Sequence, residues 1–118
     1  MEELRNRIDL SQHTFSLLGK GDFFKGEIIL QNDSFISSRF EGSIRMEGES
    51  KLVIEPSASI TGKINAHTVE LYGTVDGEID VTGIIILYPS SRVKGRIKAQ
   101  SIHVQPGAII DGDCHTLQ

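Results

Sequence analysis

A five-residue phrase occurs six times along this chain of 118 residues. Each copy has an apolar residue at both ends, polar or charged residues inside them and a glycine at its centre, as in Val93–Ile97. The central glycines are Gly26, Gly42, Gly62, Gly77, Gly95 and Gly112, spaced 16, 20, 15, 18 and 17 residues apart. A phrase that recurs at a nearly fixed period is typical of repeat proteins, in which each copy buries its apolar face against its neighbours. The sequence therefore predicts a solenoid of about six turns.

Within each turn, apolar and polar residues alternate, as in Ile79–Val81 and Ile102–Val104. A period of two indicates short strands with one buried face, and no segment shows a sustained helical period. Pro56, Pro89 and Pro106 each lie six residues before a central glycine, where a residue without a backbone N–H ends a strand. The spacings are too unequal for a left-handed hexapeptide coil. We therefore predict an all-β, single-domain right-handed parallel β-helix without helices in its core.

The repeat defines the expected domain limits. Residues 1–13 stand outside it and are expected to be a flexible N-terminal tail, residues 14–115 form the β-helix, and residues 116–118 are a C-terminal tail. Leu4 and Ile8 have helical spacing, so a short amphipathic helix that contacts a partner or a membrane is the alternative for the tail. The first ten residues are charged and lack the apolar centre of a signal peptide.

Charged residues flank the glycines in a regular order. If equivalent positions stack about 4.8 Å apart, Lys63, Glu78, Arg96 and Asp113 form a ladder of alternating sign on the outer face. Directly opposed unlike charges contribute about 0.2–1 kcal/mol each, and like charges destabilise. The ladder therefore predicts control of the register, because a slip of one whole turn would change every pair.

Sequence signals for chemistry are weak. The histidines (His13, His67, His103 and His115) have no zinc-binding spacing, and the single Cys114 is expected to be a small buried apolar residue. There is no phosphate loop and no Ser-His-Asp set, so we expect no enzyme, no metal and no cofactor. A net charge of −4 gives no reason to expect nucleic acid. The basic row Arg92 to Lys98 is interpreted as a solvated face that acidic neighbours neutralise, with a polyanion or anionic-lipid patch as the alternative.

The ends of the predicted solenoid carry little cover. An uncapped terminal turn exposes its core and a row of unpaired backbone groups, so it invites another copy of the chain. The candidate contact residues are Ile102, Val104, Ile109 and Ile110 at the C-terminal end and Leu17, Leu18, Phe23 and Phe24 at the N-terminal end. The alternative is that these residues fill the core of their own turns. Contacts between like ends give a filament without polarity, and head-to-tail contacts give a polar one; the sequence leaves both open.

The chain resembles the bactofilin family. The resemblance covers about residues 14–115 and rests on the phrases Leu18–Gly21 with Phe24–Gly26, Phe40–Ile44, Gly73–Ile79 and Pro106–Cys114. It implies a right-handed β-helix that polymerises spontaneously, without nucleotide, into bacterial cytoskeletal filaments. It further implies a cytoplasmic scaffold at the inner face of the cell membrane that positions cell-wall or cell-shape proteins, with membrane contact through the N-terminal tail. The tail here is mixed in charge, unlike the hydrophobic or basic tails of many members.

A trimeric left-handed β-helix enzyme, of the acyltransferase or zinc hydratase type, is the alternative function. It predicts discrete trimers, and the hydratase type also predicts bound zinc. The bactofilin interpretation predicts filaments and an empty metal assay.

Overall fold

The computed structural model describes residues 7–9 and 23–116, and every regular element in these ranges is a β-strand. Long strands of eight residues alternate with short strands along the chain. The strands are β1 (Arg7–Asp9), β2 (Phe23–Leu30), β3 (Ser34–Ile36), β4 (Arg39–Met46), β5 (Lys51–Ile54), β6 (Ser59–Ala66), β7 (Thr68–Leu71), β8 (Thr74–Val81), β9 (Ile84–Leu87), β10 (Arg92–Ala99), β11 (Ser101–Val104) and β12 (Ile109–Thr116).

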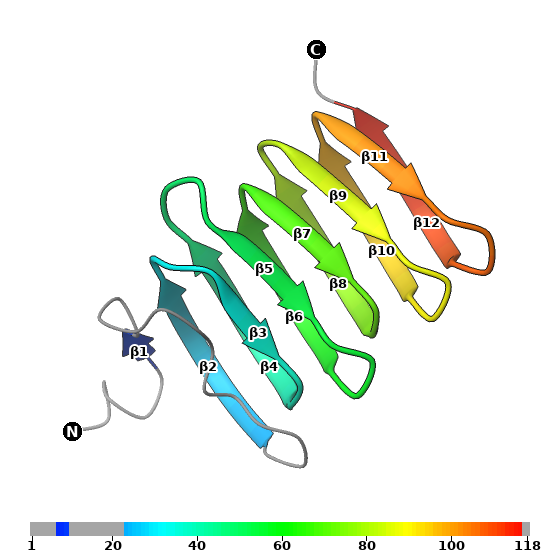
Figure 1. Cartoon of the computed structure of the whole chain (residues 1–118). Coiled ribbons are helices and arrows are strands. Elements are labelled where there is room, and N and C mark those ends of the chain that lie inside the picture. Colours follow the sequence, from blue (N-terminus) through cyan, green and yellow to red (C-terminus); the bar gives the residue numbers. More distant parts are fainter. Residues whose placement is uncertain (1–6, 10–22, 117–118) are drawn as a thin grey trace.

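Two parallel sheets run along a single coil (Figure 1). The seven-stranded sheet has the order β1-β2-β4-β6-β8-β10-β12, and the five-stranded sheet has the order β11-β9-β7-β5-β3. In Figure 1 the short strands lie in front and run down to the right while the coil advances to the upper right, so it is right-handed. This is the usual hand of a crossover between parallel strands. The predicted β-helix of about six turns is confirmed, and the left-handed alternative is wrong.

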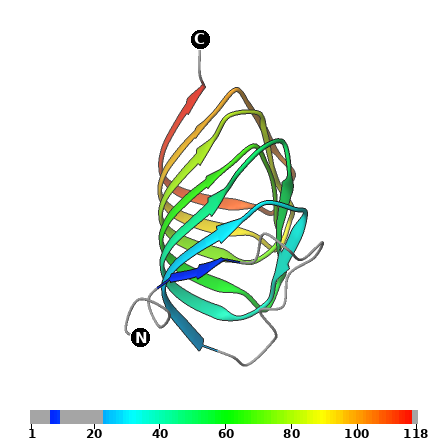
Figure 2. The same cartoon turned by 90° about the vertical axis from the view of Figure 1, so that its left-hand side faces the viewer.

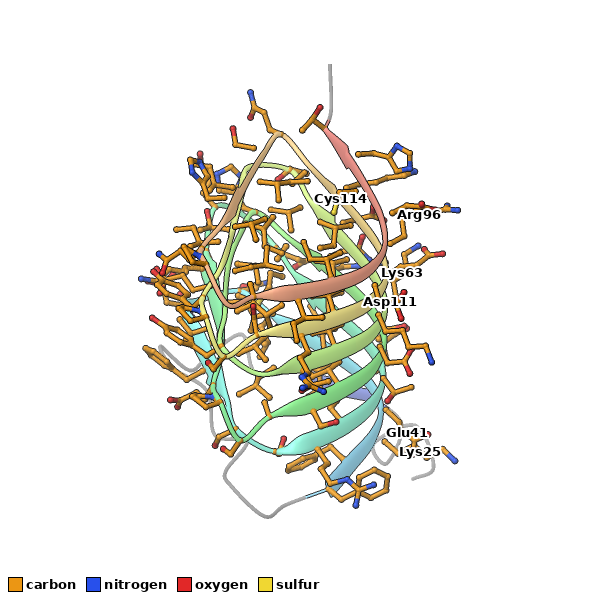
Figure 3. The ribbon with its side chains drawn as sticks, turned by 90° about the vertical axis from the view of Figure 1, so that its right-hand side faces the viewer. Lys25, Glu41, Lys63, Arg96, Asp111 and Cys114 are labelled. Atoms are coloured by element: carbon orange, nitrogen blue, oxygen red, sulfur yellow. The ribbon has the colours of Figure 1, made fainter. Side chains whose placement is uncertain are left out.

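The central glycines stack in one column, from Gly26 through Gly42, Gly62, Gly77 and Gly95 to Gly112. Each long strand bends near its glycine, so the seven-stranded sheet wraps round two sides of the coil and the short strands form the third (Figures 2 and 3). Gly95 has a φ of +133°, a conformation that L side chains rarely adopt. A Cβ on Gly95 would lie 1.9 Å from the carbonyl oxygen of Gly77. Only glycine fits at this bend.

The core is a set of apolar columns inside the coil. Phe40, Ile60, Val75 and Val93 follow one another directly through the registers of the long strands, and each is at most 2% exposed. The short strands supply matching columns, such as Leu52, Val69 and Ile85. Each turn thus covers the apolar face of the turn before it, which is the arrangement that the repeat predicts.

The proline corners also agree with the sequence pattern. β5, β9 and β11 end two residues before Pro56, Pro89 and Pro106, and the same backbone hydrogen bond closes each corner. The donors and acceptors are Ala58 N to Glu55 O, Ser91 N to Tyr88 O and Ala108 N to Gln105 O, at 2.9–3.1 Å. In the fourth turn Gly73 replaces this corner, and the rings of Tyr72 and Tyr88 stack there with centroids 4.2 Å apart.

At the N-terminal end, the short strand β1 pairs with the second half of β2, with Arg7 opposite Glu27 and Asp9 opposite Ile29. β1 falls within the segment 1–13 that the sequence places outside the repeat. The domain limits stay a prediction, because the remainder of residues 1–22 lies outside the described residues, as do Leu17 and Leu18.

Candidate functional surfaces

The last described turn of the coil, formed by β11 and β12, leaves part of the core uncovered. In the fifth turn, Ile85 and Leu87 of β9 are 0% exposed. Their partners in β11 are Ile102 and Val104, and Val104 is 51% exposed although it occupies the same inward column. The difference arises because Leu87 is covered by the next turn, whereas no described turn follows β11. The end therefore presents apolar side chains where another layer would fit.

The long strand β12 shows the same loss of cover. Ile110 continues the inward column of Val93 and packs against the core while remaining partly exposed. Cys114 continues the column of Ile97, points inward (Figure 3) and is exposed. The expectation of a buried Cys114 is wrong, because the cover that buries Ile97 is missing one turn later. Partial burial and the charge of Asp113 raise the pKa of this thiol, so it is protonated at neutral pH and a poor nucleophile.

Ile109 lies on the side of the coil. It pairs with Arg92 in an outward column and is 49% exposed. Of the four candidate residues at the C-terminal end, Ile102, Val104 and Ile110 thus share the open cross-section, and Ile109 belongs to the lateral surface. A role of these residues in assembly stays a prediction.

Two of the four N-terminal candidates fall within the described residues. Phe24 occupies the inward column above Phe40 and packs against the core. Phe23 occupies the outward column above Arg39, whose guanidinium carbon lies 5.4 Å from the centroid of its ring. Such a cation–π contact stabilises an exposed aromatic ring by about 0.5–1 kcal/mol. Phe23 and Ile109 are therefore the two ends of one outward column, and Phe24 and Ile110 are the two ends of one inward column.

The predicted charge ladder has its residues in adjacent positions. The registers place Lys63 beside Glu78, Glu78 beside Arg96, and Arg96 beside Asp113. Among the described residues, however, none of these four side chains takes part in an ion pair within 4.0 Å or in a hydrogen bond. The side chains point into solvent, and control of the register through them stays a prediction.

We expect Arg96→Glu to lower the free energy of unfolding by about 1 kcal/mol, because the new carboxylate lies between Glu78 and Asp113. The triple variant Arg96→Glu, Glu78→Lys and Asp113→Lys restores opposite charges on both sides of position 96 and should recover part of this loss. Denaturant unfolding at low salt measures both values. A triple variant that is no more stable than the single one would show that the ladder does not act.

His67 has two polar neighbours on the surface. His67 lies within hydrogen-bonding distance of Thr82, with its Nδ1 3.0 Å from the hydroxyl oxygen, and Nε2 lies 3.9 Å from a carboxylate oxygen of Glu49. In residues 7–9 and 23–116, no group of three or more His, Cys, Asp or Glu side chains could hold a metal ion. A helix long and apolar enough to cross a membrane is likewise not found in these ranges.

Two apolar residues of the short strands face outward, and the sequence analysis singles out neither of them. Phe35 of β3 and Ile84 of β9 are 44% and 43% exposed. The period of two contains the signal, because Phe35 lies between the buried residues Ser34 and Ile36.

The described strands form a solenoid of stacked, similar layers, and its last described turn exposes apolar side chains. The model of the family described as "Bactofilin: Polymer-forming cytoskeletal" matches residues 16–115. The chain belongs to the bactofilin family. It is similar to Bactofilin BacO of Myxococcus xanthus (strain DK1622), with 30% identity over 98 residues that cover 83% of this chain and 76% of the relative. No solved structure matches the chain.

Proposed function

We propose that this protein is a structural scaffold that assembles end to end into filaments without nucleotide. The observation that carries the proposal is the exposure of the last described turn, in which Val104 is 51% exposed while Leu87, one layer below, is 0% exposed. Burying apolar surface of this kind yields roughly 25 cal/mol per Å², and the unpaired edge of β12 offers backbone hydrogen bonds as well. A second copy of the chain can supply both an apolar surface to cover the exposed side chains and backbone groups to pair with β12.

The family supports a structural role in the cytoplasm, because it is described as cytoskeletal. We propose that the protein is not an enzyme and that it positions envelope or cell-shape proteins at the inner face of the membrane. Any direct lipid contact would come from the N-terminal segment.

The test uses the purified full chain without added nucleotide. Electron microscopy should show filaments, and ultracentrifugation should pellet the protein equally with and without ATP or GTP. Discrete particles of fixed size at high concentration would overturn end-to-end assembly.

A further inference from the structure

The charges on the outer face of the seven-stranded sheet are sorted by turn. The outward residues Asp76, Glu78 and Asp80 of β8 are all acidic. Directly beside them in β10 lie Lys94, Arg96 and Lys98, which are all basic. β12 follows with Asp111 and Asp113. An acidic row, a basic row and a second acidic row therefore cross the sheet at successive layers.

These charges are available to a partner. Of the six side chains in the first two rows, five are exposed, and Asp80 is partly exposed. Among the described residues, none of the six makes an ion pair within 4.0 Å or a hydrogen bond, although unlike charges are neighbours in register. The acidic row of β8 and the basic row of β10 thus lie side by side on the surface with their charges facing solvent.

The part of the sheet that follows the glycine bend contains a pattern that is complementary to itself. We call this part of β6, β8, β10 and β12 the ladder facet; its outward columns are Lys63, Glu78, Arg96, Asp113 and Asn65, Asp80, Lys98, His115. Figure 3 shows Lys63 and Arg96 on the same side of the coil. From Lys63 to Asp113 the side-chain charges of the first column are positive, negative, positive and negative. In a second copy that runs in the opposite direction, each position of the column therefore carries the opposite charge.

This order selects one way of laying two copies together. When two ladder facets face each other with antiparallel coil axes, a two-fold axis between the fourth and fifth turns relates them. Lys63 then lies opposite Asp113 of the second copy, and Glu78 opposite Arg96 of the second copy. In the neighbouring column, Asp80 lies opposite Lys98 of the second copy. Each charged side chain of one ladder facet then lies opposite a side chain of unlike charge in the other copy.

The parallel arrangements fit less well. Two copies in register with parallel axes bring Glu78 against Asp80 of the second copy, and Arg96 against Lys98 of the second copy. Like charges in an interface disfavour the wrong arrangement. A parallel pair staggered by one turn matches unlike charges over three turns, whereas the antiparallel pair matches four.

We propose that the ladder facet is a lateral contact at which two copies of this chain pair side by side with antiparallel axes. Exposed ion pairs contribute only about 0.2–1 kcal/mol each, so the contact between two single molecules is weak. Copies joined into a rod repeat the contact many times, and linked contacts gain strongly in apparent affinity. The contact lies on the side of the coil and does not depend on assembly through its ends.

A zero-length carbodiimide cross-link between Lys63 and Asp113 tests the arrangement. Within one molecule these residues are three layers apart, about 14 Å at the spacing of neighbouring strands, so the link forms only between molecules. Peptide mass spectrometry of the full-length protein at low salt should detect it. It should fall at least tenfold at about 1 M salt, where the screening length is about 3 Å. The internal ion pair of Lys51 and Glu70, 3.3 Å apart, provides a link within one molecule that reports an intact fold.

Two matched variants test the charges. Glu78→Lys with Asp80→Lys makes both central rows basic, and Arg96→Glu with Lys98→Glu makes both acidic. Each variant alone should lose the Lys63–Asp113 link at least tenfold, and the mixture should regain it, because the two facets are then complementary. Weakening of the fold would not be repaired by mixing, and circular dichroism monitors it.

A link that is missing at low salt, persists in both separate variants or does not return on mixing would overturn the lateral contact. Electron microscopy of the same samples detects filaments independently of the cross-link. Filaments without the link overturn the lateral contact alone. The link without filaments leaves it standing and overturns end-to-end assembly.

Discussion

Gly95→Ala should unfold the protein or lower its free energy of unfolding by more than about 4 kcal/mol, a large part of the 5–15 kcal/mol of a typical domain. The added Cβ would lie 1.9 Å from the carbonyl oxygen of Gly77, and the φ of +133° is unfavourable for alanine. The blocking atom belongs to the backbone of a central layer, so no side-chain rotation relieves the clash. Denaturant unfolding followed by circular dichroism measures the loss.

Gly48→Ala is the matched control. Gly48 also has a positive φ, of +76°, but a Cβ there would meet nothing within 4 Å. We expect a loss of only about 1 kcal/mol, because the backbone conformation alone is unfavourable. Equal losses in the two variants would show that the close approach of the stacked glycines does not limit stability.

The second large effect concerns assembly. Ile110→Arg should leave a folded protein that no longer forms filaments, because a charged side chain in the open cross-section would be buried without a partner in any end contact. Ile110 is partly buried against the core, so Val104→Arg, at a position that is 51% exposed, provides a variant with less effect on the fold. Pelleting assays and electron microscopy should show nearly complete loss of polymer in both.

The control for these variants is Ile84→Arg, which replaces an isoleucine that is 43% exposed on the lateral surface of β9. It adds the same charge away from either end and should leave filament formation unchanged. Unchanged filaments in both Ile110→Arg and Val104→Arg would contradict a contact through the C-terminal end.

Much of the fold follows from the sequence because its repeat is both local and regular. The glycine phrase predicts which residues stack: Gly77, Gly95 and Gly112 fall in one column, as expected. The prolines predict the corners, and the alternation of apolar and polar residues predicts the buried face. Each of these features is determined by residues that are adjacent in the sequence or one repeat apart, so it can be read from the sequence alone.

The remaining features depend on what covers each residue. Cys114 matches Ile97 in pattern but is exposed, since burial requires a following layer that the pattern does not contain. The bend at the glycines was also not predicted, because a glycine in a strand signals close approach without giving the direction of the chain. Ile109 was assigned to the end because it is apolar, whereas its register with Arg92 places it on the side.

The stacked glycines accept any number of layers, because each layer needs only another glycine above and below it. The charges obey a stricter rule, since Lys63, Glu78, Arg96 and Asp113 change sign at each step. Excising the stretch from Glu78 to Gly95 would keep the glycines in phase, yet it would put Arg96 in the position of Glu78, directly beside the like charge of Lys63. Excising two layers would restore the order. The glycine column therefore tolerates the gain or loss of a single layer, whereas the alternating charges are preserved only when layers are gained or lost in pairs.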